Sequence, residues 1–518
     1  MINLSPREYQ QKIFETSKNN NTLVVLPTGL GKTLIALMLS IERLKKYPTK
    51  KIVFLAPTKP LVDQHFEYFK ANLPDLFADL QIFTGAVPAK QRKKIWQTSE
   101  IIFSTPQCIS NDLQNYLYDL KEVSLLIIDE AHRCLKNYDY TKIAKTYKNQ
   151  ASAELQRILG LTASPGSDSI KIKEICNHLA IDEFEIRTRD SPDVEPYLQD
   201  LEFNKIEVPF PKEFIEIQTL LKTLYLQKVE QLKNRNVLFG SVNKITLLQL
   251  QKKLFSQTSS SSGNVFAALS LCAQAIKISH AIELLESQTL SGLKEYLQNL
   301  VKQAEQKKSK GVQTLVNSSE FKATLLSLNH LLSQKIEHPK IEELKTLVES
   351  EFQKNENTKI IVFSQFRETA SIISKTLNSI PKVKASVFIG QAKKSNSEGE
   401  KSGLSQKEQK QAIENFREGK INILCATSIG EEGLDIPEVS AVFFYEPIPS
   451  AIRKIQRTGR TARLAPGKLF ILITKNTRDE IAHYASSARE KKMYKTLSQV
   501  KEDMKNDKKV KNLKEFIS

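Results

Sequence analysis

Cysteine and histidine are scarce in this chain, and neither residue type is clustered. The five cysteines are odd in number and far apart, and no two form a Cys-x-x-Cys pair: Cys108, Cys134, Cys176, Cys272 and Cys425. This spacing argues against a disulfide framework and a zinc site, and it predicts a reducing compartment. The seven histidines are equally scattered, so we expect no structural metal.

Long hydrophobic runs are also missing. No uninterrupted apolar run approaches the ~18 residues that a membrane span needs. Met1 to Pro6 leads into polar sequence rather than into the apolar core of a signal peptide. We therefore expect no membrane segment and no secretory leader. The content of 40% hydrophobic and 26% charged residues is typical of a globular chain.

Acidic residues are too few to balance the basic ones. Asp and Glu number 58 against 76 Lys and Arg, which gives a formal net charge of +18. Such an excess predicts a polyanionic partner, nucleic acid before membrane, although a merely Lys-rich composition would give the same balance. The length of 518 residues allows roughly two to four domains.

One glycine-containing stretch has the context of a phosphate-binding loop. It reads Leu26-Pro27-Thr28-Gly29-Leu30-Gly31-Lys32-Thr33, after an apolar run and before a helical pattern. In a strand–loop–helix unit, backbone N–H groups and the helix N-terminus bind phosphate. Lys32 is placed to reach the β- and γ-phosphates of ATP, and the Thr33 hydroxyl is placed to bind Mg²⁺. Leu26 stands where the usual pattern has glycine.

The chain alternates strand and helix patterns in two regions. The short apolar runs are typical of buried parallel strands: 22–26, 52–56, 80–84, 101–104, 125–129 and 158–162, then 360–364, 385–389, 421–426, 441–445 and 469–474. Between them, residues from about 205 to 345 have helical spacing. The fold class predicted is α/β, with two parallel-sheet domains and a helical insertion.

The domain boundaries follow from these changes of pattern. We predict a first ATP-binding domain at 1–203, a helical insertion that binds nucleic acid at 204–348, a second sheet domain at 349–490 and a basic C-terminal tail at 491–518. The tail is either a frayed end or an electrostatic contact to nucleic acid.

Two carboxylates follow the apolar run that ends at Ile128. Asp129-Glu130-Ala131-His132 would place Asp129 at a strand tip, where it can hold Mg²⁺, and Glu130 beside it, where it can act as general base on the attacking water. The alternative reading is a solvated turn, which the preceding phosphate loop disfavours. His132 is expected to couple the site to motion.

The second domain carries an arginine-rich stretch, Gln456-Arg457-Thr458-Gly459-Arg460-Thr461-Ala462-Arg463. We predict a helix that presents Arg460 and Arg463, three residues apart, on one face. From there they would reach a γ-phosphate held by the first domain and stabilise the transition state, while Gln456 positions the water. Alone, an arginine face is usually only solvated.

Together these motifs resemble the superfamily 2 DEAH-box helicases, in the family's order across nearly the whole chain. The stretches Ser191–Tyr197, Gly430–Pro437 and Tyr445–Arg453 are most similar to archaeal Hef and the Fanconi anaemia M-type DNA translocases. Ala462 departs from the family's usual glycine. No Glu-Arg-Lys nuclease signature follows residue 490, so DNA cleavage is not expected.

The resemblance implies two RecA-like domains, ATP and Mg²⁺ as cofactors, and roles for further residues. Gln10 would read the adenine, Gly433 and Asp435 would approach the nucleotide together with the loop residues Pro27 to Thr33, and Thr162 and Ser164 would couple the domains. The residues that would contact the nucleic-acid backbone are Thr58, Lys59, Thr105, Gln107, Gln365 and Thr427.

The same resemblance implies unwinding in the 3′ to 5′ sense, branch migration on forked or branched DNA, stalled-fork repair and a cytoplasmic, nucleoid-associated location. An RNA-directed relative stimulated by double-stranded RNA is the alternative, although the sequence shows no clear aromatic base-stacking platform. A third reading is a scaffold that uses nucleotide only as a switch. A partnership with a separate nuclease or a sliding clamp is left open.

Overall fold

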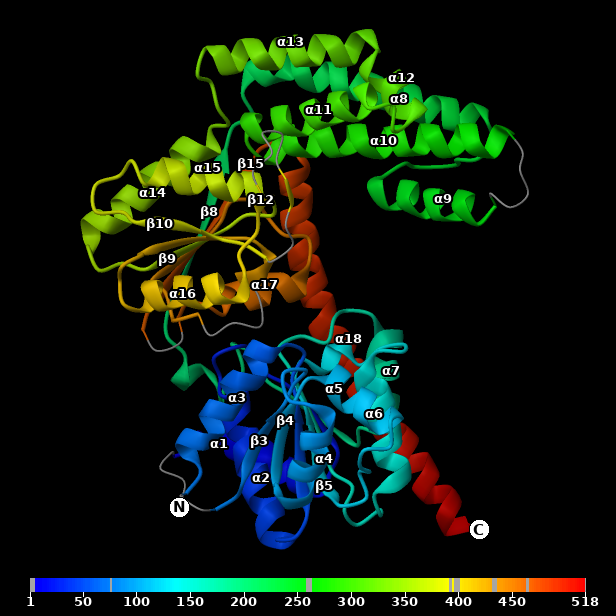
Figure 1. The fold of residues 1–518 in the computed structure, drawn as a ribbon, viewed down its shortest axis with the longest axis vertical. Helices are drawn as coiled ribbons and strands as arrows, with labels where there is room; N and C mark the ends of the chain where they lie inside the picture. Colours follow the sequence, from blue (N-terminus) through cyan, green and yellow to red (C-terminus); the bar gives the residue numbers. More distant parts are fainter. Residues whose placement is uncertain are drawn as a thin grey trace.

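The computed structural model describes residues 5–74, 77–257, 263–390, 394–395, 401–430, 436–462 and 465–517. Two α/β lobes and a helical domain are stacked along the longest axis of the molecule (Figure 1). Lobe 1 comprises residues 5–200, the helical domain 209–339, and lobe 2 residues 201–208 and 340–477. The predicted α/β fold class with a helical insertion is confirmed.

Lobe 1 is built on a parallel sheet of seven strands in the order β3-β4-β2-β5-β6-β1-β7. The strands are β1 (Thr22–Val25), β2 (Lys51–Leu55), β3 (Leu80–Phe83), β4 (Ile101–Ser104), β5 (Val123–Ile128), β6 (Ile158–Thr162) and β7 (Glu183–Ile186). The helices are α1 (Glu8–Asn19), α2 (Lys32–Lys46), α3 (Lys59–Asn72), α4 (Ala89–Thr98), α5 (Pro106–Gln114), α6 (Asp139–Gln150) and α7 (Ser169–Leu179).

Helices cover both faces of this sheet, which explains why its central strands are continuous apolar runs. Helices α1, α2 and α3 pack on one face, and α4 to α7 pack on the other. Every residue of β1, β2, β4, β5 and β6 is buried. The strand tips that carry the predicted motifs therefore meet at one edge of a rigid sheet.

The helical domain contains α8 (Ile215–Asn234), α9 (Lys244–Ser256), α10 (Gly263–Ser287), α11 (Leu290–Glu305), α12 (Lys310–Val316) and α13 (Ser319–Ser333). Within the described residues, α10 alone is long and apolar enough to cross a membrane, and 44% of its most apolar window is buried inside the protein. Leu285 of α10 packs in one core with Leu221 of α8, and Cys272 packs in another with Leu250 of α9. Helix α10 is thus the shared core helix of the bundle.

Lobe 2 is built on a parallel sheet of six strands in the order β10-β13-β9-β14-β15-β8. The strands are β8 (Leu201–Val208), β9 (Ile360–Phe363), β10 (Ala385–Phe388), β13 (Ile423–Ala426), β14 (Ala441–Phe444) and β15 (Gly467–Thr474), and a hairpin is formed by β11 (Lys394–Ser395) and β12 (Lys401–Ser402). The helices are α14 (Lys340–Lys354), α15 (Arg367–Leu377), α16 (Gln406–Arg417) and α17 (Ala451–Thr458), followed by α18 (Arg478–Ile517).

Strand β8 corrects the sequence prediction of helices from residue 204 onward. It pairs in parallel with β15, from Leu201 opposite Gly467 to Val208 opposite Thr474. The boundary predicted between residues 203 and 204 therefore falls inside a strand of lobe 2. The strand escaped prediction because charged residues interrupt it and most of its side chains are not fully buried, as at a sheet edge.

Helix α18 also differs from the separate basic tail predicted at 491–518. It begins at Arg478, directly after lobe 2, and runs along lobe 1 toward the C-terminus (Figure 1). Met493, Leu497 and Val500 are at most 1% exposed and lie in the core of lobe 1 beside α7. The start of the predicted tail is thus docked by apolar contacts, neither frayed nor purely electrostatic.

Candidate nucleotide site and nucleic-acid interface

The phosphate loop joins β1 to α2 at the carboxyl edge of the lobe 1 sheet. Gly29 and Gly31 have φ angles of 86° and 77°, in the left-handed region that favours glycine. A β-carbon on Gly31 would lie 2.3 Å from Gln10 Nε2. Because α2 begins at Lys32, its positive dipole end closes the loop, as an anion site requires.

Lys32 folds over the beginning of this loop. Its Nζ donates to the carbonyl oxygens of Leu26 at 2.7 Å and Pro27 at 3.4 Å. Phosphate oxygens of ATP are charged and would be stronger acceptors for the same ammonium group. The structure therefore keeps the lysine beside the loop, in reach of a bound phosphate.

Gln10 clamps the loop from α1. Its Oε1 accepts from Arg7 N at 2.8 Å, and its Nε2 donates to Leu30 O at 3.1 Å. The Tyr9 hydroxyl donates to the same Leu30 oxygen at 2.9 Å. With a side chain only 4% exposed, Gln10 has a structural task at the loop, and its predicted contact with adenine stays a prediction.

Asp129 and Glu130 follow the carboxyl end of β5. Asp129 N donates to Leu55 O at 2.9 Å, which fixes this corner on β2. Burial would raise the pKa of Asp129, but the hydrogen bond from His65 and the charge of Lys32 lower it below the usual value. The carboxylate is therefore held ionised, as a magnesium ligand must be.

Glu130 adopts a strained backbone conformation. Its φ of 49° lies in the left-handed region. This conformation costs a non-glycine residue of order 1–3 kcal/mol, and residues strained in this way cluster at active sites. The carboxylate is nearly buried, and its Oε2 lies 3.2 Å from His132 Nδ1. The strained residue directly follows Asp129 after β5, at the same carboxyl edge of the sheet at which the phosphate loop follows β1.

The predicted coupling residues form a connected chain. His132 Nδ1 lies 3.1 Å from Thr162 Oγ1, and Thr162 Oγ1 accepts from Ser164 N at 3.1 Å. Ser164 Oγ then donates to Met493 Sδ at 2.8 Å. A path of direct contacts therefore runs from Glu130 to α18, a helix that sequence reasoning did not connect to the site.

Lobe 2 meets the phosphate loop through the arginine-rich stretch. A β-carbon on Gly459 would lie 1.6 Å from Thr28 Oγ1 and 2.7 Å from Thr28 Cβ. Gln456 and Arg460 are 3% and 8% exposed, so both are enclosed near this contact. The stretch faces the loop of lobe 1, as a site shared by two lobes requires.

The arrangement of the arginines differs from the single helical face predicted. Helix α17 ends at Thr458, so Arg460 lies in the turn that follows. The buried Arg457 packs its guanidinium carbon 4.7 Å from the ring centre of Phe363 and 5.9 Å from that of Phe444, a cation–π contact with the lobe 2 core. The predicted site residues Arg463, Gly433 and Asp435 lie outside the described residues.

The residues predicted to contact nucleic acid lie after strand ends of both lobes. Thr58 stands at the N-cap position of α3, after β2 and next to Lys59, and Thr105 stands at that position of α5, after β4 and two residues before Gln107. Gln365 follows β9, and Thr427 follows β13. Lys59, Gln107 and Gln365 are exposed, whereas Thr427 is buried. Carboxyl ends of parallel strands share one edge, so the lobes present these positions from corresponding edges.

The magnesium ligands predicted from sequence are joined by a residue that sequence reasoning missed. His65 of α3 lies between Thr33 Oγ1 and Asp129 Oδ2. A hydroxyl and a carboxylate are the hard oxygen donors that Mg²⁺ prefers, and a nucleotide phosphate would add others. The residues present therefore fit a magnesium ion held by Thr33 and Asp129.

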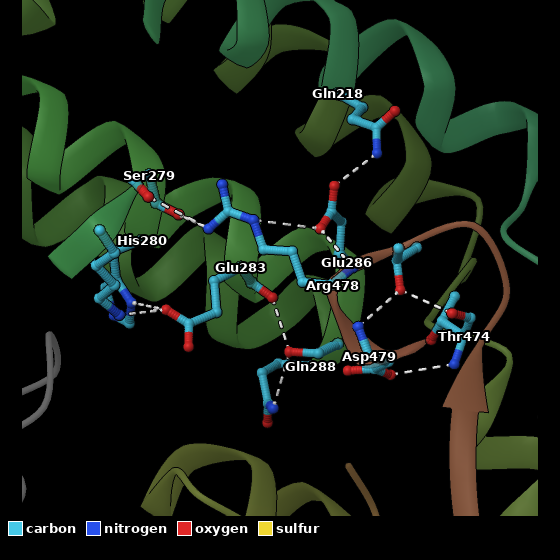
Figure 2. Close-up of polar contacts among 12 residues, drawn as sticks. Gln218, Ser279, His280, Glu283, Glu286, Gln288, Thr474, Arg478 and Asp479 are labelled. Carbon is cyan, nitrogen blue, oxygen red and sulfur yellow. Dashed lines mark hydrogen bonds and ion pairs between the residues drawn. The ribbon is translucent and has the colours of Figure 1, made fainter. Parts of the chain in front are cut away.

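Polar contacts tie the helical domain to lobe 2 and to the start of α18. Arg478 Nη1 donates to Ser279 O at 2.9 Å, and its Nε lies 3.6 Å from Glu286 (Figure 2). Gln218 Nε2 donates to the other oxygen of Glu286 at 2.8 Å. The buried ion pair of Lys340 and Asp479 lies close by. These contacts join three elements of the chain at one corner.

Glu446 extends this junction toward the arginine-rich stretch. Its Oε2 accepts from Gln288 Nε2 at 3.2 Å, and Gln288 Oε1 accepts from Thr369 Oγ1 at 2.9 Å. Burial raises the pKa of Glu446 to about 7, against the opposing effect of the Arg457 charge. A single buried carboxyl thus faces the helical domain on one side and Arg457 on the other.

Three comparisons with known proteins bear on this site. The DEAD/DEAH box helicase family model matches residues 7–172, the helicase conserved C-terminal domain matches 339–465, and a helical bundle described from ATP-dependent RNA helicases matches 213–336. The crystal structure of the Pyrococcus furiosus Hef helicase domain is similar with a TM-score of 0.69 and 40% identity, covering 93% of this chain and 98% of that one.

Two curated relatives are similar over nearly the whole chain. A Methanocaldococcus jannaschii protein whose name describes an ATP-dependent RNA helicase is 38% identical over 95% of this chain, and the ATP-dependent DNA helicase mph1 of Neurospora crassa is 35% identical over 92%. The chain covers 61% and 42% of these relatives' own lengths.

Proposed function

The chain belongs to the superfamily 2 helicases of the Hef and Fanconi anaemia M type, and from this premise we propose that it is an ATP-dependent DNA helicase and translocase acting on forked or branched DNA. The proposal includes unwinding in the 3′ to 5′ sense, branch migration and the repair of stalled forks. The observation that carries it is the contact between Gly459 and Thr28, which puts the arginine-rich stretch of lobe 2 against the phosphate loop of lobe 1.

The residues that take part in ATP hydrolysis would come from both lobes. In lobe 1, Lys32 binds the β- and γ-phosphates of ATP, and Glu130 accepts the proton of the attacking water. In lobe 2, Gln456 orients that water and Arg460 stabilises the charge that spreads over the γ-phosphate in the transition state.

Mg²⁺, bound through Thr33 and Asp129, would neutralise phosphate charge and polarise the γ-phosphate. The low pKa of Asp129 keeps its carboxylate ionised for that task. The hydrogen bond from Asp129 N to Leu55 O fixes the carboxylate's position on the sheet. The protein thus supplies rigid oxygen ligands before nucleotide arrives.

The two lobes would move relative to each other because each holds part of the nucleotide site. ATP binding favours the closed arrangement because each lobe holds part of the site, and hydrolysis removes that link. The contacts of Arg478, Glu286 and Glu446 join the helical domain to lobe 2, so the two would move as one body against lobe 1. The protein residues of the two lobes that are predicted to contact nucleic acid would then move closer together or farther apart along a bound strand.

The net charge of +18 supports a nucleic acid of either kind as the substrate, because both are polyanions. The relative from Neurospora crassa, which is named a DNA helicase, favours DNA. The name of the Methanocaldococcus jannaschii relative favours RNA as the second candidate. Cooperation with a separate nuclease or a sliding clamp, and a cytoplasmic, nucleoid-associated location, belong to the same proposal.

ATP hydrolysis rates on a panel of nucleic acids test the proposal. Forks, four-way junctions, linear duplex DNA and double-stranded RNA of equal length should be compared at the same nucleotide concentration. We expect the forks and junctions to stimulate turnover most. Preferential stimulation by RNA would overturn the choice of DNA, and equal stimulation by linear duplexes would overturn the branched specificity.

Two variants separate a motor from a nucleotide-dependent scaffold. Lys32→Ala should abolish turnover and leave DNA binding largely intact, and Glu130→Gln should bind ATP but hydrolyse it at least about 100-fold more slowly. A folded Lys32→Ala protein with the parental rate would contradict the phosphate-loop assignment. Equal turnover by Glu130→Gln and the parent would favour the scaffold.

A further inference from the structure

We propose that His65 is a positioning residue that prepares the two magnesium ligands of the nucleotide site; this inference rests on the proposed ATP hydrolysis. Its Nε2 lies 3.0 Å from Asp129 Oδ2, and its Nδ1 lies 3.4 Å from Thr33 Oγ1. One side chain therefore spans the gap between the hydroxyl and the carboxylate that the cation would share.

The donor and acceptor groups present determine the direction of each hydrogen bond that a neutral His65 makes. A carboxylate only accepts, so Nε2 carries the proton and donates to Asp129. Nδ1 is then an acceptor and receives the hydroxyl proton of Thr33. This leaves the lone pairs of Thr33 Oγ1 for a cation and restrains one oxygen of Asp129, while the carboxylate retains acceptor sites on its two oxygens.

The surroundings fix the imidazole ring. His65 is 7% exposed, and its ring centre lies 4.4 Å from that of Phe54. Phe54 in turn stacks on Phe103 and meets Phe69 edge to face. The ring is held by an aromatic wall of β2, β4 and α3, so the spacing of Thr33 and Asp129 is set by the core of lobe 1.

Outer partners that orient metal ligands typically contribute 10- to 100-fold in metal affinity. Replacing His65 with leucine keeps volume but removes both hydrogen bonds. Replacing it with glutamine keeps a donor and an acceptor. A positioning role therefore predicts that leucine weakens Mg²⁺ binding and that glutamine largely restores it, whereas a purely packing role predicts that both variants behave alike.

The test measures binding of a fluorescent ATP analogue to the full chain during titration with Mg²⁺ and, separately, in EDTA. We expect His65→Leu to raise the Mg²⁺ concentration for half-maximal binding about 10-fold, to leave binding in EDTA unchanged, and His65→Gln to stay within about 3-fold of the parent. His178→Leu is the matched control, because His178 lies on α7 of the same lobe and its Nδ1 lies 3.1 Å from the Cys134 carbonyl oxygen rather than from a proposed magnesium ligand.

An unchanged Mg²⁺ midpoint in a folded His65→Leu protein would overturn the inference. So would an equal loss of analogue binding with and without Mg²⁺, because that result indicates disturbed packing. The measurement needs no nucleic acid. A failure of DNA to stimulate hydrolysis would therefore contradict the proposed function and leave this result unchanged.

Discussion

Gly459 of lobe 2 lies directly against Thr28 of the phosphate loop, so closely that a β-carbon on the glycine would fall 1.6 Å from the threonine hydroxyl oxygen. The contact joins residues that are far apart in the chain and in different lobes. It defines how near the arginine-rich stretch can come to the phosphate loop. Any side chain at position 459 must separate the lobes or displace the loop.

The first prediction concerns this contact. Gly459→Ala should lower the turnover number for ATP about 100-fold, because misplacing catalytic groups by about 1 Å costs that much. Steady-state ATP hydrolysis with saturating DNA measures the effect. Thr28→Gly removes the two closest atoms that the new methyl group would meet and leaves the Ile455 carbonyl oxygen at 3.3 Å, so the double variant should recover part of the lost rate. A Gly459→Ala protein with parental turnover would show that the lobes do not need this approach.

The second prediction concerns the docking of α18. Met493→Asp places a carboxylate where the parent side chain is fully buried in lobe 1, which should cost about 3 kcal/mol or more of docking free energy. Limited proteolysis should then cleave within α18 faster than in the parent. Met493→Leu keeps the apolar volume and should remain protected, so equal protection of the aspartate variant would refute the docking.

The third prediction concerns pH. Burial raises the pKa of Glu446 from 4.5 to about 7, so between these values the folded protein keeps a proton that the unfolded chain has lost. This group therefore lowers stability as pH rises through that window, by up to about 3 kcal/mol. Glu446→Gln cannot titrate and should flatten that decline. Thermal midpoints of the parent and variant from pH 5 to pH 8 check it, and parallel curves would contradict it.

The fourth prediction concerns Ala462, a buried residue with a positive φ angle. Its φ of 54° lies in the left-handed region, where a β-carbon costs about 1–2 kcal/mol. Ala462→Gly relieves that strain but adds freedom to the unfolded chain. We expect a net gain of up to about 1 kcal/mol, seen as a higher thermal midpoint. A lower midpoint would mean that the buried methyl group outweighs the strain.

The buried parallel strands could be predicted from sequence because both of their faces are covered. The runs at Ile101–Ser104 and Ile158–Thr162 are buried throughout, have only their last residue polar, and lie where predicted. Their ends carry the motif residues, so the edge of each sheet could be placed as well. The edge strands β7 and β8 could not, since charged side chains alternate along them and weaken the apolar pattern.

His65 illustrates what motif reading cannot supply. Nothing in the spacing of α3 distinguishes it from a core histidine, because its partners Thr33 and Asp129 come from two other elements. Unlike His65, the apolar residues of α18 that dock on lobe 1 have a sequence pattern. They recur at helical spacing in a Lys-rich segment: Met493, Leu497 and Val500. That periodicity predicts one apolar face on α18, but only packing shows that lobe 1 receives it.

Strand β8 has a consequence for the order in which the protein can assemble. The sheet of lobe 2 takes its edge from residues 201–208 and the neighbouring strand from residues 467–474, so the whole helical domain is synthesised between two paired strands. Lobe 1's sheet and the helical bundle can form as their residues leave the ribosome, whereas the sheet of lobe 2 must wait until residues 467–474 have emerged. A stop in translation between residues 208 and 467 would therefore leave a complete lobe 1 followed by a strand without its pairing partner.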